Sequence, residues 1–187
     1  MIIGVTGAIC SGTTTFMNYL EEKGFTALSY SDVLRNEARK RGIEITRKSL
    51  QDLGDQLRKE KGNGVLSLLL IEMMKKGKNY VIGNIRNPGE VEILREKFGN
   101  EFILIIVEAS QEKRFSRLVK RARENDPQNF EDFKKMEERD LGIGQKESGQ
   151  QHGKVFQMID FAVENERELD DFYEKIDNLI DDLDIKI

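Results

Sequence analysis

The sequence lacks the residues that several kinds of protein site require. It contains one cysteine, Cys10, and one histidine, His152, which excludes an internal disulfide, a metal site built on histidines and a Ser–His pair. No apolar run approaches the roughly 18 residues that a membrane helix needs. No basic stretch of a signal peptide precedes the first apolar run. We therefore expect a cytoplasmic protein with no membrane partner.

An excess of basic residues is also missing. Lys and Arg number 30 against 34 Asp and Glu, so the net charge is −4, whereas nucleic-acid-binding domains usually carry a basic surplus. With 38% hydrophobic residues, the composition is that of a globular chain rather than a disordered one. A length of 187 residues suits one domain better than two. We expect a single domain over residues 1–187 and no nucleic-acid partner.

Short apolar runs alternate with longer segments of helical periodicity. The run FILIIV, residues 102–107, has no polar alternation, so both faces of this strand should be buried, as in a parallel sheet covered by helices. The other predicted strands are residues 2–6, 25–29, 80–82 and 160–164. This alternation predicts an α/β fold with a mostly parallel sheet.

Polar residues mark where the intervening helices begin. Ser31 and Thr46 are predicted to cap helices that run to about residues 41 and 59. The pair Asn87-Pro88 is typical of an N-cap and first helical residue. Three more helices are predicted: from residue 87 to about 98, from 110 to about 124, and over the apolar 3/4 repeat of residues 169–183.

Two segments leave alternatives open. VLSLLLIEMM, residues 65–74, is apolar nearly all round, which indicates either a core helix or a subunit interface in a homodimer. Residues 125–153 are polar and glycine-rich without a strand pattern. A long polar insertion of this kind is usually a lid or binding flap, although a surface insertion would look the same.

The stretch GAICSGTTT carries the strongest functional signal. Gly7-x-x-x-x-Gly12-x-Thr14 follows a predicted strand and opens a helix, the setting in which such a loop cradles phosphate with its backbone amides. The Thr14 hydroxyl falls where Mg²⁺ would be bound. The alternative is a tight turn that merely joins strand to helix. The predicted nucleotide-binding residues are Gly7, Ala8, Cys10, Ser11, Gly12, Thr13, Thr14 and Thr15.

Thr13 stands where such loops usually carry lysine. A threonine can donate one hydrogen bond but brings no charge. Since a hydrogen bond to a charged group is worth roughly 1.5–3 kcal/mol, phosphate binding should survive. Catalysis should suffer more than binding from the loss of the lysine, because one cation at the transition state can be worth about 10³–10⁵ in rate.

Arginines follow the second and third predicted strands. Asp32, Arg35 and Arg39 lie on one segment, with the two arginines four residues apart on one helix face. Arg86 comes just after the third strand, where open α/β sheets bind ligands. Converging arginines are what an acceptor monophosphate needs, although Arg39 alone is equally well explained as part of a solvated helix face.

A basic helix, KRFSRLVKRARE, leads into the polar segment. We expect Arg117, Arg121 and Arg123 to close on the transferred phosphoryl group, and Arg139 to join them from the lid. A solvated helix face is the alternative for each of them. Arg86, Arg117 and Arg121 are the predicted catalytic residues.

The order of these motifs resembles the nucleoside monophosphate kinase branch of P-loop proteins, and within it the adenylate-kinase-related proteins of archaea and some bacteria. The resemblance rests on GAICSGTTT, SDVLR, IRNPGEVE and RFSRLVKRARENDP and covers nearly the whole chain. It implies a three-layer α/β/α P-loop NTPase fold with a five-stranded parallel sheet, a nucleoside-monophosphate-binding helical region near residues 31–76 and a lid near 121–150.

The resemblance also implies an activity and its ligands. ATP and Mg²⁺ would be the cofactors, with ATP phosphates at residues 7–15. Asp32, Arg35 and Arg86 would bind the acceptor nucleotide, and Arg117, Arg121 and Arg123 would serve the lid side. The reaction would be phosphoryl transfer to a nucleoside or deoxynucleoside monophosphate.

The chain departs from the family pattern at two positions. The loop lysine is replaced by Thr13, and the usual Asp-Gly after the third strand reads Gly83-Asn84. Similar loops, with GQQ motifs like residues 149–151, occur in kinase-like regions of deoxycytidylate-deaminase-related proteins, whose zinc motifs H-x-E and P-C-x-x-C this sequence lacks. A catalytically degenerate nucleotide sensor or regulatory module is therefore the alternative to an enzyme. A structural or nucleic-acid-associated protein is a third.

Overall fold

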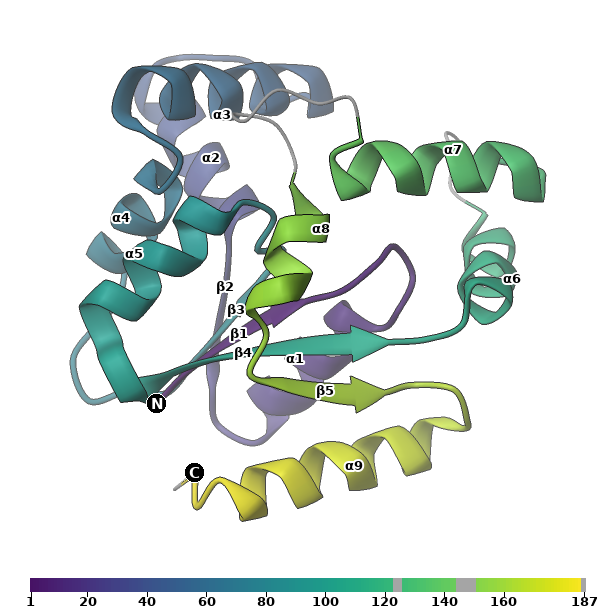
Figure 1. Ribbon diagram of the computed structural model, residues 1–187. Coiled ribbons are helices and arrows are strands. Elements are labelled where there is room, and N and C mark those ends of the chain that lie inside the picture. The colour runs from purple at the N-terminus through teal and green to yellow at the C-terminus, as the bar shows by residue number, and fades with distance from the viewer. Residues whose placement is uncertain (123–125, 144–150, 186–187) are drawn as a thin grey trace.

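Five parallel strands form the centre of the protein, in the order β2-β3-β1-β4-β5 (Figure 1). The computed structural model describes residues 1–122, 126–143 and 151–185. The strands are β1 (Ile2–Thr6), β2 (Thr26–Ser29), β3 (Tyr80–Gly83), β4 (Phe102–Glu108) and β5 (Phe161–Glu164). The predicted five-stranded parallel sheet is confirmed.

Helices cover both faces of this sheet (Figure 1). On one face lie α1 (Thr13–Glu22) and α9 (Leu169–Asp182), which contribute Phe16 and Phe172 to a shared apolar core. On the other lie α4 (Val65–Glu72), α5 (Pro88–Phe98) and the short α8 (His152–Val155), with Leu66, Leu94 and Val155 in a second core. The three-layer α/β/α arrangement is thus confirmed.

The register of the strands places several loops together. Gly83 of β3 lies opposite both Val5 of β1 and Ser29 of β2. Thr6, the last residue of β1, lies opposite Ile106 of β4. Because all these strands are parallel, the loops that follow β1, β2 and β3 emerge from one edge of the sheet, where such folds bind ligands.

The remaining helices flank that edge. α2 (Tyr30–Lys40) and α3 (Arg47–Lys61) contact each other and α4, and together they occupy the predicted nucleoside-monophosphate-binding region. α6 (Gln111–Arg121) follows β4, and α7 (Phe130–Leu141) follows α6. Two 3₁₀ turns, η1 (Gly99–Glu101) and η2 (Phe156–Met158), precede β4 and β5.

Two predicted helix boundaries are wrong. α2 is capped by Ser29, whose Oγ accepts a hydrogen bond from the Asp32 amide, so Ser31 lies inside the helix. α6 ends at Arg121 rather than near residue 124, because Ala122 turns to a left-handed φ of 47°. The caps at Thr46 and Asn87 are confirmed, and both form capping boxes.

α7 is a helix that the sequence analysis did not predict. Its Phe130 and Phe133 pack against Phe115 of α6 with ring centroids 5.3 and 5.5 Å apart. Glu137 forms a buried ion pair with Arg114 of α6. The polar segment therefore contains an element docked on α6, while residues 144–150 of the predicted lid lie outside the described part of the chain.

α4 supports the core alternative for residues 65–74. Val65, Leu66, Ser67 and Leu70 are buried, whereas Leu68 is 49% exposed. One exposed leucine does not form an apolar face, so the homodimer remains a prediction. No helix among the described residues is long and apolar enough to cross a membrane.

Candidate phosphate-binding site

The chain between β1 and α1 curls sharply. Cys10 has a φ of 61° and Gly12 a φ of 118°, both left-handed. The Ser11 amide donates a hydrogen bond to the Ala8 carbonyl at 3.0 Å, which closes the turn. This curl leads directly into Thr13, Thr14 and Thr15, the first turn of α1.

The outer side of the loop faces two arginines of α6. Arg114 Nη1 donates to the Ile9 carbonyl at 3.5 Å. Arg117 Nη1 donates to the carbonyls of Ser11 at 3.2 Å and Cys10 at 3.4 Å. In a trans peptide, a carbonyl and the next residue's N–H point in opposite directions. The N–H groups of Cys10, Ser11 and Gly12 therefore point away from α6, toward the side where an anion-binding nest would lie, and of these the Ser11 N–H is used in closing the turn.

Asn165 completes this arrangement from the end of β5. Its Nδ2 donates to the Ser11 carbonyl at 2.7 Å, and its backbone O and Oδ1 both accept from Arg117 Nη2 at 2.9 Å. Asn165 is buried. We call Arg114, Arg117 and Asn165 the loop brace, because they fix which way the loop peptides point. The sequence analysis missed Asn165 and assigned Arg117 to the lid. The only sequence signal for Asn165 is that it is a polar residue directly after a predicted strand.

The inner side of the loop is closely packed and contains one buried hydroxyl without a partner. A Cβ on Gly7 would lie 2.5 Å from Ser11 Oγ and 2.6 Å from the Val107 carbonyl, so only glycine fits there. Ser11 Oγ is buried without a hydrogen-bond partner, a state that costs about 1–3 kcal/mol. No side chain caps α1, and its first turn contains no acidic residue. These features fit an oligophosphate at the positive end of the helix.

Thr14 is the residue best suited to hold Mg²⁺ here. It is exposed in the first turn of α1, whereas Thr13 is half-buried. Within the residues that the structure describes, no group of three or more His, Cys, Asp and Glu side chains is arranged to bind a metal ion. A magnesium ion would therefore depend on the Thr14 hydroxyl together with phosphate oxygens and water.

Where P-loop kinases usually carry an aspartate after β3, this protein has Gly83, and the side chain of Met17 fills the adjoining space. A Cβ on Gly83 would overlap the Sδ of Met17, which reaches across from α1. Asn84 adopts a φ of 62°, a left-handed conformation that glycine and asparagine tolerate. The position used for a carboxylate in related loops is therefore occupied by a thioether.

Arg86 lies in the loop that follows β3, and its role at the acceptor stays a prediction. Its amide donates to Glu90 Oε2 at 2.9 Å, and its carbonyl accepts from the Gln151 amide at 2.8 Å. Burial, and after it the positive charge of the nearby Arg86, lower the pKa of His152 to about 3. The structure thus brings Arg86 next to the start of α8.

Asp32 and Arg35 lie together at the end of β2. Asp32 accepts from Ser29 Oγ at 2.6 Å and from Arg35 Nη1 at 3.0 Å, and both side chains are exposed. Arg39 is one turn farther along α2 and donates to Asn36 of its own helix at 3.0 Å. Asp32 and Arg35 therefore form an exposed pair at the start of α2, and Arg39 has the surroundings of a solvated helix face.

The predicted lid arginines are dispersed. Arg121 forms a two-point ion pair with Asp126, with Nη2–Oδ1 at 2.7 Å and Nε–Oδ2 at 3.0 Å. Hydrogen bonding to Asp126 raises the pKa of Arg121, and Cys10 also contributes to this rise. Arg139 is exposed in the last turn of α7, and Arg123 lies outside the described residues.

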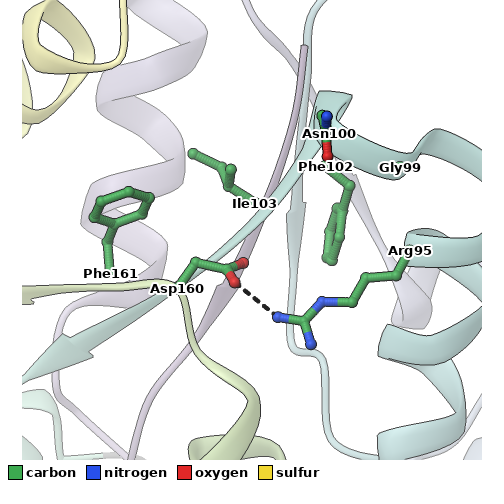
Figure 2. Close-up of a pocket in the computed structure, with 7 residues that line it drawn as sticks. All are labelled: Arg95, Gly99, Asn100, Phe102, Ile103, Asp160 and Phe161. Carbon is green, nitrogen blue, oxygen red and sulfur yellow. Dashed lines mark hydrogen bonds and ion pairs between the residues drawn. The ribbon is translucent and has the colours of Figure 1, made fainter.

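A pocket of about 550 Å³ lies away from the loop, around the start of β4 (Figure 2). Figure 2 shows Arg95 and Asp160 pointing toward each other across it, with Nη2–Oδ1 at 2.8 Å. Asp160 Oδ2 also accepts from the Leu104 amide at 2.7 Å. The charged groups of this pocket are paired with each other and link α5 to β4. We therefore assign them a structural role and do not take the pocket as the candidate site.

Comparisons with known proteins agree with this geometry. Residues 3–142 match the family model AAA_18, an AAA domain. A UPF0200 protein of Thermococcus onnurineus is 32% identical over 186 residues, which cover 97% of each chain.

Two solved structures share the fold. TT1252 from Thermus thermophilus superposes with a TM-score of 0.58 at 18% identity, covering 98% of this chain and 97% of that one. Shikimate kinase from Bacteroides thetaiotaomicron superposes with a TM-score of 0.56 at 11% identity, covering 99% of each chain. The predicted resemblance to P-loop kinase-like proteins is confirmed at the level of the fold. This chain belongs to the UPF0200 family, matches the AAA domain model over residues 3–142 and has a P-loop kinase-like fold.

Proposed function

We propose that this protein transfers a phosphoryl group from Mg²⁺-bound ATP to a nucleoside or deoxynucleoside monophosphate. The loop brace is the observation that carries the proposal. Three consecutive carbonyls, those of Ile9, Cys10 and Ser11, are turned toward α6. The opposite side of the loop holds backbone amides, of which that of Ser11 closes the turn, together with an unpaired hydroxyl and the start of a helix, groups of the kind that bind an oligophosphate.

The donor would be held by residues 7–15. Backbone amides and Ser11 Oγ would bind its phosphates, Thr13 would add a hydrogen bond, and Thr14 would bind Mg²⁺. ATP supplies the phosphoryl group, and Mg²⁺ neutralises phosphate charge. Action in the cytoplasm, where reduced thiols such as Cys10 persist, is part of the proposal.

Arginines would replace the charge of the missing loop lysine. Arg117 and Arg114 donate to loop carbonyls, which polarises the same peptide groups and strengthens their amides as donors. Arg121 approaches the loop from the end of α6 and would act at the transferred phosphoryl group. Arg86, with Arg35 and Asp32, would bind and orient the acceptor monophosphate, because these residues follow β3 and β2.

Binding without turnover, in a nucleotide sensor or regulatory module, is the second candidate function. It is favoured by the contact of Met17 with Gly83, because a side chain at position 83 could be accommodated only if the thioether of Met17 moved aside. Compared with the usual P-loop kinase site, this protein therefore lacks one positive side chain at Thr13 and one negative side chain at Gly83. A sensor requires the loop brace but neither of those groups.

One assay separates the two functions. Purified protein is incubated with Mg²⁺-ATP and a panel of ribo- and deoxyribonucleoside monophosphates, and ADP and nucleoside diphosphates are measured by chromatography. A kinase forms both products in equal amounts, and Thr13→Lys should raise its turnover because it restores the transition-state cation. Asn18→Lys, which adds the same charge at an exposed position of α1, is the matched control and should not.

Thermal stabilisation gives the complementary result. Stabilisation by the triphosphate without any turnover supports the sensor. If neither triphosphate nor monophosphate shifts the melting temperature and no product forms, both functions are wrong.

A further inference from the structure

A buried carboxylate next to the candidate site is connected to the backbone of Arg86. Glu90 lies in the first turn of α5, with its side chain 1% exposed. Its Oε2 accepts from the amides of Arg86 at 2.9 Å and Asn87 at 3.1 Å. A capping box requires only the bond to Asn87. The bond to Arg86 extends the same carboxylate to the loop that carries the predicted acceptor residue.

Arg58 of α3 supplies the charge that this carboxylate needs. Arg58 Nη2 donates to Glu90 Oε1 at 3.1 Å, and the Arg58 side chain is only 12% exposed. Its other ionic partner, Asp55, is 62% exposed at 3.5 Å, where an ion pair contributes little. Without Arg58, Glu90 would be a buried charge without a counterion, which proteins tolerate poorly.

Two further helices meet at the same residue. Ser67 Oγ of α4 donates to the Glu90 carbonyl at 2.8 Å. The hydroxyl of Tyr30, the first residue of α2, lies 2.7 Å from Ser67 Oγ in a buried hydrogen bond. Residues of α2, α3, α4 and α5 are therefore joined through Glu90 to the amide of Arg86.

The other side of Arg86 is also held. Its carbonyl accepts from the amide of Gln151, a buried residue that immediately precedes α8. The peptide groups on both sides of Arg86 are thus fixed by partners from distant parts of the chain. A guanidinium that must meet one phosphate needs a backbone fixed in this way.

We propose that Glu90 and Arg58 are positioning residues, which hold Arg86 in place for the phosphorylated acceptor and make it move together with the helical region α2–α4. This inference rests on the proposed function. It assigns a role to a side chain of α3 that does not itself border the phosphate loop. The expected effect of losing Arg58 is therefore a defect at the acceptor and not at the donor.

The protonation of Glu90 gives a second consequence. Burial raises the pKa of Glu90, and the charge of Arg58 opposes this rise. The groups that face Glu90 are Arg58 of α3, Tyr30 of α2, Ser67 of α4 and the amides before α5. Replacing Arg58 by methionine lets Glu90 take up a proton at higher pH, so acceptor binding should fail at a higher pH as the solution is acidified.

The test compares donor and acceptor affinities in Arg58→Met, Arg58→Lys and a matched control, Arg95→Met, which breaks the Arg95–Asp160 pair away from the loop. By calorimetric titration, Arg58→Met should weaken monophosphate binding by at least about tenfold, the effect of losing a charged hydrogen bond. Mg²⁺-ATP binding should change by less than about twofold. Arg58→Lys should be intermediate, and Arg95→Met should change neither. Equal losses for both ligands, or none, overturn the proposal.

Failure of the proposed function is recognised separately. If the unmodified protein binds no monophosphate, the acceptor assignment fails, and amide hydrogen exchange then decides the positioning role. Faster exchange at Arg86 and Asn87 in Arg58→Lys than in Arg95→Met supports the link from α3 to this loop. Unchanged exchange at these amides overturns it. The lysine variant keeps the charge, so this measurement remains possible where Arg58→Met does not fold.

Discussion

Met17 of α1 lies against Gly83 at the end of β3, so that a Cβ on Gly83 would overlap Met17 Sδ and lie 2.8 Å from its Cε. The two residues are 66 positions apart in the sequence but lie at the same edge of the sheet. A side chain at position 83 therefore requires the long side chain at position 17 to move aside. The loss of the carboxylate after β3 is thus a feature of packing as well as of chemistry.

The first prediction is that Gly83→Asp and Met17→Ala are coupled. Gly83→Asp alone should lower the free energy of unfolding by about 1–3 kcal/mol, because it forces Met17 aside and buries a carboxylate. In the double variant, the space left by Met17 accommodates the aspartate. Urea unfolding of the four proteins should give a coupling of about 0.5–3 kcal/mol, and simple additivity would contradict the contact.

The second prediction concerns Gly12. Gly12→Ala should abolish triphosphate binding, because the methyl group overlaps Asn165 Nδ2 and displaces it from the Ser11 carbonyl. Gly42→Ala is the matched control. Gly42 also has a positive φ, 65°, but nothing lies within 4 Å of its added Cβ, so its cost is only backbone strain of about 1–2 kcal/mol.

The prediction for Gly12 is tested by measuring the triphosphate affinity of both variants by titration and their free energy of unfolding in urea. Gly42→Ala should lose stability and keep its affinity, while Gly12→Ala should lose both. Retained affinity in Gly12→Ala would mean that the loop brace does not set the binding surface.

The sequence predicted the parts of the fold that depend on local pattern. FILIIV became β4, an interior strand between β1 and β5 that is buried along most of its length, because an uninterrupted apolar run has no side to expose. Thr46 and Asn87 cap helices because their side chains reach amides only three residues away or fewer. The glycine spacing of the loop likewise reports a local curl.

The parts that could not be predicted depend on long-range contacts. Asn165 meets Ser11 across 154 positions, and Arg58 meets Glu90 across 32. Neither pair leaves a periodic signal in the sequence. α7 was missed because its surface is polar and one buried face, formed by Phe133 and Glu137, docks on α6. The sequence analysis predicted a functional role for Arg117, but only the fold shows that it contacts the backbone carbonyls of the loop.

The third prediction separates Arg117 from the other basic residues of α6. Arg117→Met should weaken triphosphate binding by about 1.5–3 kcal/mol, since its guanidinium orients the loop carbonyls and donates to four acceptor atoms of Cys10, Ser11 and Asn165. Lys120→Met removes one charge from an exposed position of the same helix. Long-range attraction alone would make the two variants similar in calorimetric titrations, whereas the loop brace requires Arg117 to matter far more.

The last prediction is a pH dependence of stability that arises from His152. Its pKa is lowered to about 3 in the folded protein, first by burial and then by the charge of Arg86, whereas a histidine in an unfolded chain titrates near 6.5. Between these values the unfolded chain binds the extra proton, so stability rises with pH and is lost as the pH falls below about 6.5. From pH 7 to pH 5 this amounts to about 2 kcal/mol.

His152→Phe should remove this slope while keeping the ring contact with Phe156, whose centroid lies 5.8 Å away. His152 Nε2 is buried without a hydrogen-bond partner, so the substitution sacrifices no bond at that atom. The carboxylates titrate in both proteins, and their contribution cancels when unfolding free energies are compared at pH 7, 6 and 5. The variant should be the more stable protein at pH 5 by a margin that shrinks toward pH 7. Parallel curves would show that His152 accepts its proton in the folded state, and would contradict its buried position beside Arg86.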